Sequence, residues 1–175
     1  MKSIYFTRFL FLACLLIGIS YTADAQKKVK SPPKTSSQTI GALTVDINYN
    51  APSVRGRKIW GGLEAYGEVW RTGANSATTF TINKDVTIDG QVLSAGTYAL
   101  FTIPEKDQWT IIFNKESDQW GAYNYQQSKD ALRLTVTPNY EHEFTEQMTF
   151  EVQEDGEVSL MWEKLKVSFN LIAEK

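Results

Sequence analysis

The sequence is poor in the side chains that build redox and metal sites: its 175 residues include one cysteine and one histidine. Disulfide bonds and zinc–thiolate centres need several cysteines, and histidine-based metal sites need two or three ligands at characteristic spacing. A domain of about 150 residues buries roughly 70% of the surface of its unfolded chain, which suffices for a stable core without such links. We therefore expect a domain held by its hydrophobic core, with no metal site and no cofactor.

The sequence also lacks an apolar stretch long enough to cross a bilayer as a helix, which takes roughly 20 residues. The longest stretch, Phe9–Ile19, follows two basic residues and precedes Ala23 and Ala25. This arrangement predicts a cleavable signal peptide over residues 1–25, and export to the periplasm or the cell exterior with no transmembrane span in the mature chain. Cys14 offers an alternative, lipidation at a loose lipobox, which the apolar residues after it disfavour.

Neither sign of charge dominates. The chain has 18 basic and 20 acidic side chains, and 16 and 19 remain after removal of the predicted signal peptide. This balance gives no electrostatic basis for binding nucleic acid. Four lysines fall in residues 26–37 (QKKVKSPPKTSS), which have two adjacent prolines and no apolar period and are therefore predicted to form a flexible polar tether.

After the tether, apolar and polar side chains alternate with period two. Residues 43–49 (LTVDINY) show the pattern of a strand with one buried face. Similar runs occupy residues 86–88, 92–93, 97–103, 109–113, 132–136, 148–152, 158–162 and 165–171. Turn residues separate these runs, and Asp89–Gly90 is a strong signal for a two-residue hairpin.

These patterns predict an all-β domain. Eight to nine short strands with regularly spaced turns indicate a single antiparallel β-sandwich of jelly-roll-like form, or a partly open barrel, over residues 38–175. Only residues 117–131 have helical potential, and their tyrosines and turn residues make it weak.

One glycine-rich stretch, residues 55–78, interrupts the alternation. It holds five glycines, two tryptophans and four basic residues, which is typical of an ordered loop that carries binding groups. Its aromatic rings and basic groups suit a small polar ligand or a glycan. The candidate ligand-binding residues are Arg57, Trp60, Tyr66, Trp70, Arg71 and Asn75. In the alternative interpretation, Trp60 and Trp70 fold inward as part of the core.

A second aromatic segment, residues 120–125 (WGAYNY), adds Trp120 and Tyr123 to the candidates. Loops at one end of a sandwich converge. We therefore expect this segment to meet the glycine-rich stretch and to form a cleft with it. Aromatic rings pack against the C–H faces of sugars while polar side chains bind the hydroxyls. The alternative is that these rings cap the open end of the sandwich.

Several motifs occur in a fixed order along the chain: GRKIWGGL, YGEVWRTGANSAT, LSAGTYALFTIP, WTIIFNK and WGAYNY. Together they resemble the exported bacterial family known as domain of unknown function 2911, over about residues 36–175. The resemblance implies a β-rich envelope or secreted domain with no established activity. An acidic residue often follows GAN in that family, and Ser76 at that position weakens any proposal of a catalytic carboxylate there.

Enzyme signatures are largely missing from the sequence. There is no G-x-S-x-G elbow and no glycine pattern suited to cradling phosphate. Glu64 and Glu68, beside the aromatic residues of the glycine-rich stretch, are the first candidates for a carboxylate pair. The sequence thus favours a non-catalytic module that binds a small ligand or glycan. Two alternatives remain: an envelope protein that docks a protein partner, and a carboxylate-dependent hydrolase or lyase.

Overall fold

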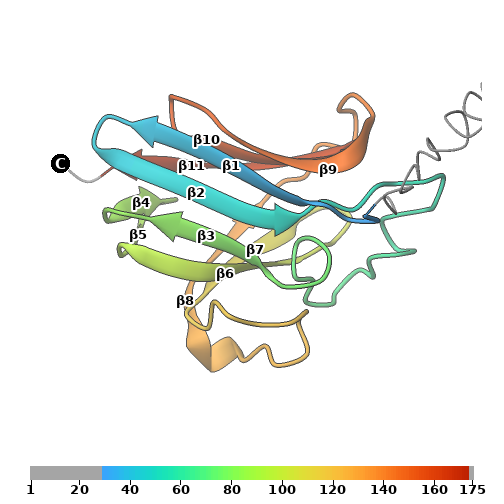
Figure 1. The fold of residues 1–175 in the computed structure, drawn as a ribbon, viewed down its shortest axis with the longest axis horizontal. Coiled ribbons are helices and arrows are strands. Elements are labelled where there is room, and N and C mark those ends of the chain that lie inside the picture. The colour runs from blue at the N-terminus through green and yellow to red at the C-terminus, as the bar shows by residue number, and fades with distance from the viewer. Residues whose placement is uncertain (1–28, 174–175) are drawn as a thin grey trace, which may run out of the picture.

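Two antiparallel sheets packed face to face form the domain (Figure 1). The computed structural model describes residues 29–173. The six-stranded sheet has the order β1 (Pro33–Ile40), β2 (Leu43–Asn50), β3 (Thr78–Ile82), β6 (Gly96–Ile103), β7 (Trp109–Asn114) and β8 (Asp130–Val136). The five-stranded sheet has the order β5 (Gln91–Leu93), β4 (Val86–Ile88), β11 (Leu165–Ala173), β10 (Glu157–Glu163) and β9 (Thr145–Val152). The predicted antiparallel sandwich is confirmed, and the sheets do not close into a barrel.

The period-two pattern determines which side of each strand faces the core. In β2, Leu43, Val45, Ile47 and Tyr49 are buried, and the polar residues between them face outward. Alternate side chains of a strand point to opposite faces, so this pattern gives the six-stranded sheet an apolar inner face and a polar outer one along β2. The same alternation runs through the first seven residues of β11.

Tight turns join several strands as the sequence predicts. Asp89 and Gly90 link β4 to β5 with φ angles of 48° and 74°. Two positive φ angles in succession are required by the hairpin turn whose twist matches that of the strands. At the reversal between β10 and β11, Glu163 also has a positive φ, of 59°.

Two of the eleven strands found within residues 29–173, β1 and β3, are not evident from the sequence. Residues 33–37, predicted as part of the tether, belong to β1, which pairs with β2 along its whole length. Because β1 is an edge strand with both faces at least partly exposed, it has no apolar period, and its order comes from backbone pairing. β3 directly follows the glycine-rich stretch and carries only two apolar side chains.

The weak helical potential of residues 117–131 yields one 3₁₀ turn, Gln127–Lys129. Among the residues that the structure describes, no helix has the length and apolar character needed to cross a bilayer. The predicted signal peptide and its cleavage site lie outside the described residues.

Candidate functional site

The two tryptophans of the glycine-rich stretch lie in the core. Trp60 and Trp70 are 6% and 4% exposed. Trp60 packs edge to face against Trp109 and Trp162, with ring centroids 4.9 and 5.7 Å away, and Trp70 stacks on Trp162 at 5.8 Å. Their ring faces are closed to a ligand from solvent. The inward-folded arrangement, which was the alternative interpretation, therefore describes both residues.

The two arginines of this stretch have different surroundings. Arg57 is exposed, and its guanidinium donates hydrogen bonds to the carbonyl oxygens of Val54 and Ser53 at 3.1 and 2.6 Å. It therefore stabilises its own loop. Arg71 is partly buried, and its Nε has no hydrogen-bond partner among the described residues. The carbonyl oxygen of Arg71 accepts the N–H of Thr78 at the start of β3.

Glu64, a candidate acid, lies in the same stretch and is partly buried. Its backbone is fixed by hydrogen bonds to Ile59 and Gly61. Burial raises the pKa of Glu64 to about 7 from an ordinary value of 4.5, and the positive charges of Arg71 and Arg57 oppose the rise only in part. This carboxyl group therefore exchanges its proton near neutral pH. The second candidate, Glu68, is exposed.

Tyr66 packs on the edge of the core and also lines an open hollow of about 390 Å³ together with residues 105–108, apart from Trp60 and Trp70. It is partly buried and packs against the main core cluster. Its hydroxyl lies near that of Tyr140, which donates to the carbonyl oxygen of Glu105 at 2.9 Å and accepts from Trp109 Nε1 at 3.3 Å. Burial raises the pKa of Tyr140, and the neighbouring Tyr66 hydroxyl adds to the rise.

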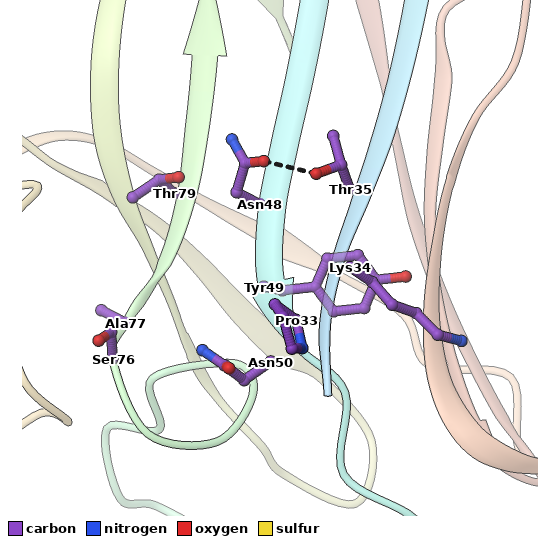
Figure 2. A pocket seen from close by; sticks show the side chains of 9 residues that line it. All are labelled: Pro33, Lys34, Thr35, Asn48, Tyr49, Asn50, Ser76, Ala77 and Thr79. Atoms are coloured by element: carbon purple, nitrogen blue, oxygen red, sulfur yellow. Dashed lines mark hydrogen bonds between the residues drawn. The ribbon is translucent and has the colours of Figure 1, made fainter. Parts of the chain in front are cut away.

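A groove with a volume of about 510 Å³ lies where the outer face of the six-stranded sheet meets the segment before β3 (Figure 2). It is lined by Pro33, Lys34 and Thr35 of β1, by Asn48, Tyr49 and Asn50 of β2, and by Ser76, Ala77 and Thr79. The side chain of Asn50 points from β2 toward the Ser76–Ala77 segment. Amide and hydroxyl groups thus share a hollow that is open to solvent with apolar atoms, which form the larger part of its exposed lining.

Trp120 and Asn75 lie beside this groove. Ser76, which lines the groove, forms an antiparallel bridge with Trp120. Two hydrogen bonds flank the bridge: Gly121 N donates to Asn75 O at 3.1 Å, and Ala77 N donates to Gln119 O at 2.9 Å. Residues that face each other in an antiparallel pair project to the same side, so the side chains of Trp120 and of the groove residue Ser76 leave the bridge on the same side.

The indole of Trp120 is the exposed one among the five tryptophans, at 64%. Tyr123 is 84% exposed, and its ring lies over Gly121, where an added Cβ would be 2.8 Å from Cε2. The predicted meeting of the two aromatic segments is therefore confirmed for residues 75–77 and 119–121. It does not include Trp60, Tyr66 or Trp70.

A partly buried polar network holds the segment that carries Trp120. Asn114 is fully buried, and its Nδ2 donates to Asp130 Oδ1 at 2.8 Å and to Gln126 O at 3.0 Å. Tyr125 donates to Asp130 Oδ2 at 2.7 Å, and Arg133 donates to both. Burial, followed by the contact with Asp130, raises the pKa of Tyr125 to about 12, so the hydroxyl stays protonated and keeps donating.

Sequence reasoning missed the polar side chains of the groove, above all Asn48, Asn50 and Thr79. In the sequence they are the outward members of alternating strands, which resemble any solvated sheet face. Their one distinguishing signal is the pair of asparagines at the end of β2, immediately before the glycine-rich stretch. Among residues 29–173, no three His, Cys, Asp or Glu side chains gather where a metal ion could bind.

The fold and the groove define a class of protein: an all-β antiparallel sandwich with a surface groove that carries amide and hydroxyl groups, and with an exposed tryptophan bridged to one of its lining residues. The model of the family described as "Protein of unknown function (DUF2911)" matches residues 31–171. The chain belongs to that family, as its motifs indicate. No curated protein and no solved structure matches the chain.

Proposed function

We propose that the protein is an exported, non-catalytic module that binds a small polar ligand or a glycan in the groove of Figure 2. The observation that carries the proposal is the exposed indole of Trp120, whose backbone is bridged to Ser76 in the lining of a groove that carries amide and hydroxyl groups. The other four tryptophans are buried in the core. Trp120 therefore contributes little to the core, and its exposed ring is free to contact a ligand.

The chemistry of the groove matches that of a sugar. An indole offers a flat face to the C–H groups of a pyranose ring, while Asn and Thr side chains exchange hydrogen bonds with its hydroxyl groups. In this proposal Asn75 and Trp120, which adjoin Ser76 through the bridge and its hydrogen bonds, flank the ligand, and Tyr123 lies near Trp120 on the same segment. The structure adds Asn48, Asn50 and Thr79 to the proposed site.

Intrinsic fluorescence tests the proposal, because a ligand in the groove changes the emission of one tryptophan. We expect a panel of soluble oligosaccharides to include a ligand that shifts the emission of the wild-type protein. Isothermal titration calorimetry, which does not depend on the Trp120 signal, then compares the variants: Trp120→Ala should abolish binding of this ligand without changing the melting temperature, since the ring is exposed. Thr135→Ala, at an exposed position on β8, is the control. A folded Trp120→Ala protein with full affinity would show that the site is wrongly placed.

Export is a separate part of the proposal, and the amino-terminal pattern supports it. Expression of the full chain in a bacterium with a periplasm, followed by mass spectrometry of the mature protein, tests it. We expect the mature chain to begin at Gln26 and to be found outside the cytoplasm. An uncleaved cytoplasmic product would contradict this part and leave the binding site untested.

A carboxylate-dependent hydrolase or lyase is the second candidate, and the pKa of Glu64 is the observation that favours it. A carboxyl that titrates near pH 7 suits general acid–base chemistry, and perturbed groups of this kind gather at functional sites. Turnover of a glycan or ester that disappears in Glu64→Gln and persists in Trp120→Ala would establish this function in place of the first.

A further inference from the structure

The outer face of the six-stranded sheet is divided into two halves of opposite character. Over β6 and β7, the outward side chains Ala99, Phe101 and Ile112 are buried, with Ala122 and Tyr125 packed against them. Over β1, β2 and β3, the outward side chains are polar and at least partly exposed. We call this second region the polar half. The groove lies at the boundary between the two.

Two rows of side chains cross the polar half from strand to strand. The strand registers place in the first row Thr35, Asn48 and Thr79, and in the second row Ser37, Asp46, Thr81 and Thr97. The first row lines the groove, and the second extends beyond it. Side chains directly opposite on one face lie about 5 Å apart, so each row is a continuous line of hydrogen-bonding groups.

Hydrogen bonds within the rows fix these groups in place. Thr35 Oγ1 donates to Asn48 Oδ1 at 2.7 Å, which leaves the amide nitrogen of Asn48 directed away from Thr35 (Figure 2). Ser37 donates to a carboxylate oxygen of Asp46, and the Thr81 and Thr97 hydroxyls are 3.0 Å apart. Groups that are already ordered lose little side-chain entropy when a ligand binds to them.

We propose that the occupant of the groove is an uncharged polysaccharide chain that continues from Trp120 across the two rows of the polar half. This inference rests on the proposed function and adds the class of ligand and its extent. The site would thus hold several consecutive sugars rather than a single ring.

The composition of the rows selects this class of ligand. The rows contain hydroxyl, amide and carboxylate groups, so a protein or lipid surface that binds by apolar contact gains nothing there. Asp46 is the charged member of the rows and Lys34 is the charged member of the groove lining, so these two opposite charges together give a polyanion no net attraction. An uncharged polymer of hydroxyl groups has partners along the whole line.

The dimensions of the rows require an extended ligand. Neighbouring strands are about 4.8 Å apart, so the first row, from β3 to β1, spans about 10 Å, and the second row, from β6 to β1, spans about 14 Å. Each length exceeds one sugar ring. Affinity should therefore increase with chain length until the row is filled, and then level off.

The first experiment is affinity electrophoresis of the purified domain in gels that contain uncharged polysaccharides (β-glucans, α-glucans, xylan, mannan and galactan) or acidic ones (alginate, hyaluronan and heparin). We expect at least one uncharged polymer, and no acidic one, to retard the protein. Retardation by acidic polymers alone, or by no polymer, would overturn the inference. If acidic polymers alone retard the protein and Trp120→Ala abolishes that retardation, the groove is still supported as a binding site.

The second experiment titrates the domain with a length series, two to six sugars, cut from the polymer that binds. We expect the Kd to fall at least tenfold across the series. Thr81→Val keeps the shape of a residue in the second row and removes its hydroxyl. It should weaken binding of the six-sugar ligand about threefold to tenfold, the effect of one hydrogen bond, and leave the two-sugar ligand unaffected.

Thr135→Val on β8 is the matched control, because it makes the same change on the outer face near the opposite edge of the same sheet. It should leave every affinity unchanged. Equal affinities for two and six sugars, with no effect of Thr81→Val, would overturn the inference. If that binding still depended on Trp120, the proposed function would stand. Binding that survives Trp120→Ala would instead refute the proposed function.

Discussion

Ser76 and Trp120 face each other across an isolated antiparallel bridge that joins the glycine-rich stretch to the second aromatic segment. The backbone around the bridge is unusual, since Asn75 and Gly121 on either side both have positive φ angles, of 60° and 69°. The hydrogen bond from Gly121 N to Asn75 O then fixes the two segments together. An indole on an otherwise irregular segment is in this way held at a defined place beside the groove.

The exposure of Trp120 predicts a two-component response to quenching. Iodide, a charged quencher, should reach one of the five tryptophans and leave the four buried ones almost unaffected. Trp120→Phe should remove the quenchable component and leave the near-ultraviolet circular dichroism of the buried indole cluster intact. Uniform quenching of all the emission would show that the cluster is open to solvent.

The buried tryptophans differ in their hydrogen bonds, which allows a matched comparison. Trp70 Nε1 donates to the carbonyl oxygen of Gly73 at 3.1 Å, whereas Trp162 Nε1 is buried with no partner among the described residues. Both Trp→Phe substitutions remove a similar volume. Trp70→Phe should therefore lower the free energy of unfolding by about 1 kcal/mol more than Trp162→Phe, because it also leaves an acceptor unpaired. Urea unfolding measures the difference, and the reverse order would contradict the structure.

Two glycines with positive φ differ sharply in their surroundings. A Cβ on Gly156, where φ is 93°, would lie 2.3 Å from the carbonyl oxygen of Leu171, which is backbone and has little freedom to move. Gly90, where φ is 74°, has open space around that position. Gly90→Ala should cost about 1 kcal/mol for backbone strain alone. Gly156→Ala should cost about 3 kcal/mol or more, and equal losses would contradict the close approach.

Glu64 makes the stability of the domain depend on pH. Because its pKa is raised in the folded state, the folded protein binds this proton more tightly than the unfolded chain does. The stabilisation is complete below about pH 4.5 and is lost as the pH rises through about 7. Glu64→Gln should therefore be more stable than the wild type above pH 7, by about 2 kcal/mol.

Chemical unfolding at pH 5 and pH 8 measures this effect, and the advantage of Glu64→Gln should be smaller at pH 5. Glu68→Gln, which removes a carboxyl from an exposed part of the same stretch, controls for the loss of one negative charge. An identical advantage at both pH values would show that Glu64 is ionised in the folded protein across this range.

Asn114 links the polar network to the segment that carries Trp120. Asn114→Ala removes the hydrogen bonds to Asp130 Oδ1 and to the backbone N–H of Glu116, while Asp130 Oδ2 keeps its bonds from Tyr125 and Arg133, and it should destabilise the domain by about 2–3 kcal/mol. It should also speed amide hydrogen exchange in residues 115–126. Lys115→Ala, at the neighbouring exposed position, should do neither. Unchanged exchange in Asn114→Ala would mean that the segment is held by other contacts.

The strands that bury one face in the core could be predicted, because burial of alternate side chains leaves a period of two residues in the sequence. The alternation in residues 43–49 and the turn at Asp89–Gly90 identify strands and a hairpin from local rules alone. β1 leaves no such signal, since edge pairing with β2 depends on the backbone and not on its side chains.

The site was only partly predictable, for a different reason. Trp60, Trp70 and Trp120 all lie in segments rich in turns, and their sequence contexts do not distinguish a buried indole from an exposed one. The difference is set by partners far along the chain, because Trp109 and Trp162 enclose the first two. The groove needs β2 and residues 76–79 side by side, a relationship that exists only after the sheet has formed.

The position of β1 has a practical consequence for any surface-based measurement. The chain enters the sandwich at Pro33, a residue of the groove, and leaves it at Ala173 at the opposite end (Figure 1). Attachment to a sensor chip or a fluorescent fusion through the carboxyl end therefore keeps the groove accessible. The same attachment placed just ahead of Pro33 stands at its mouth and obstructs large ligands.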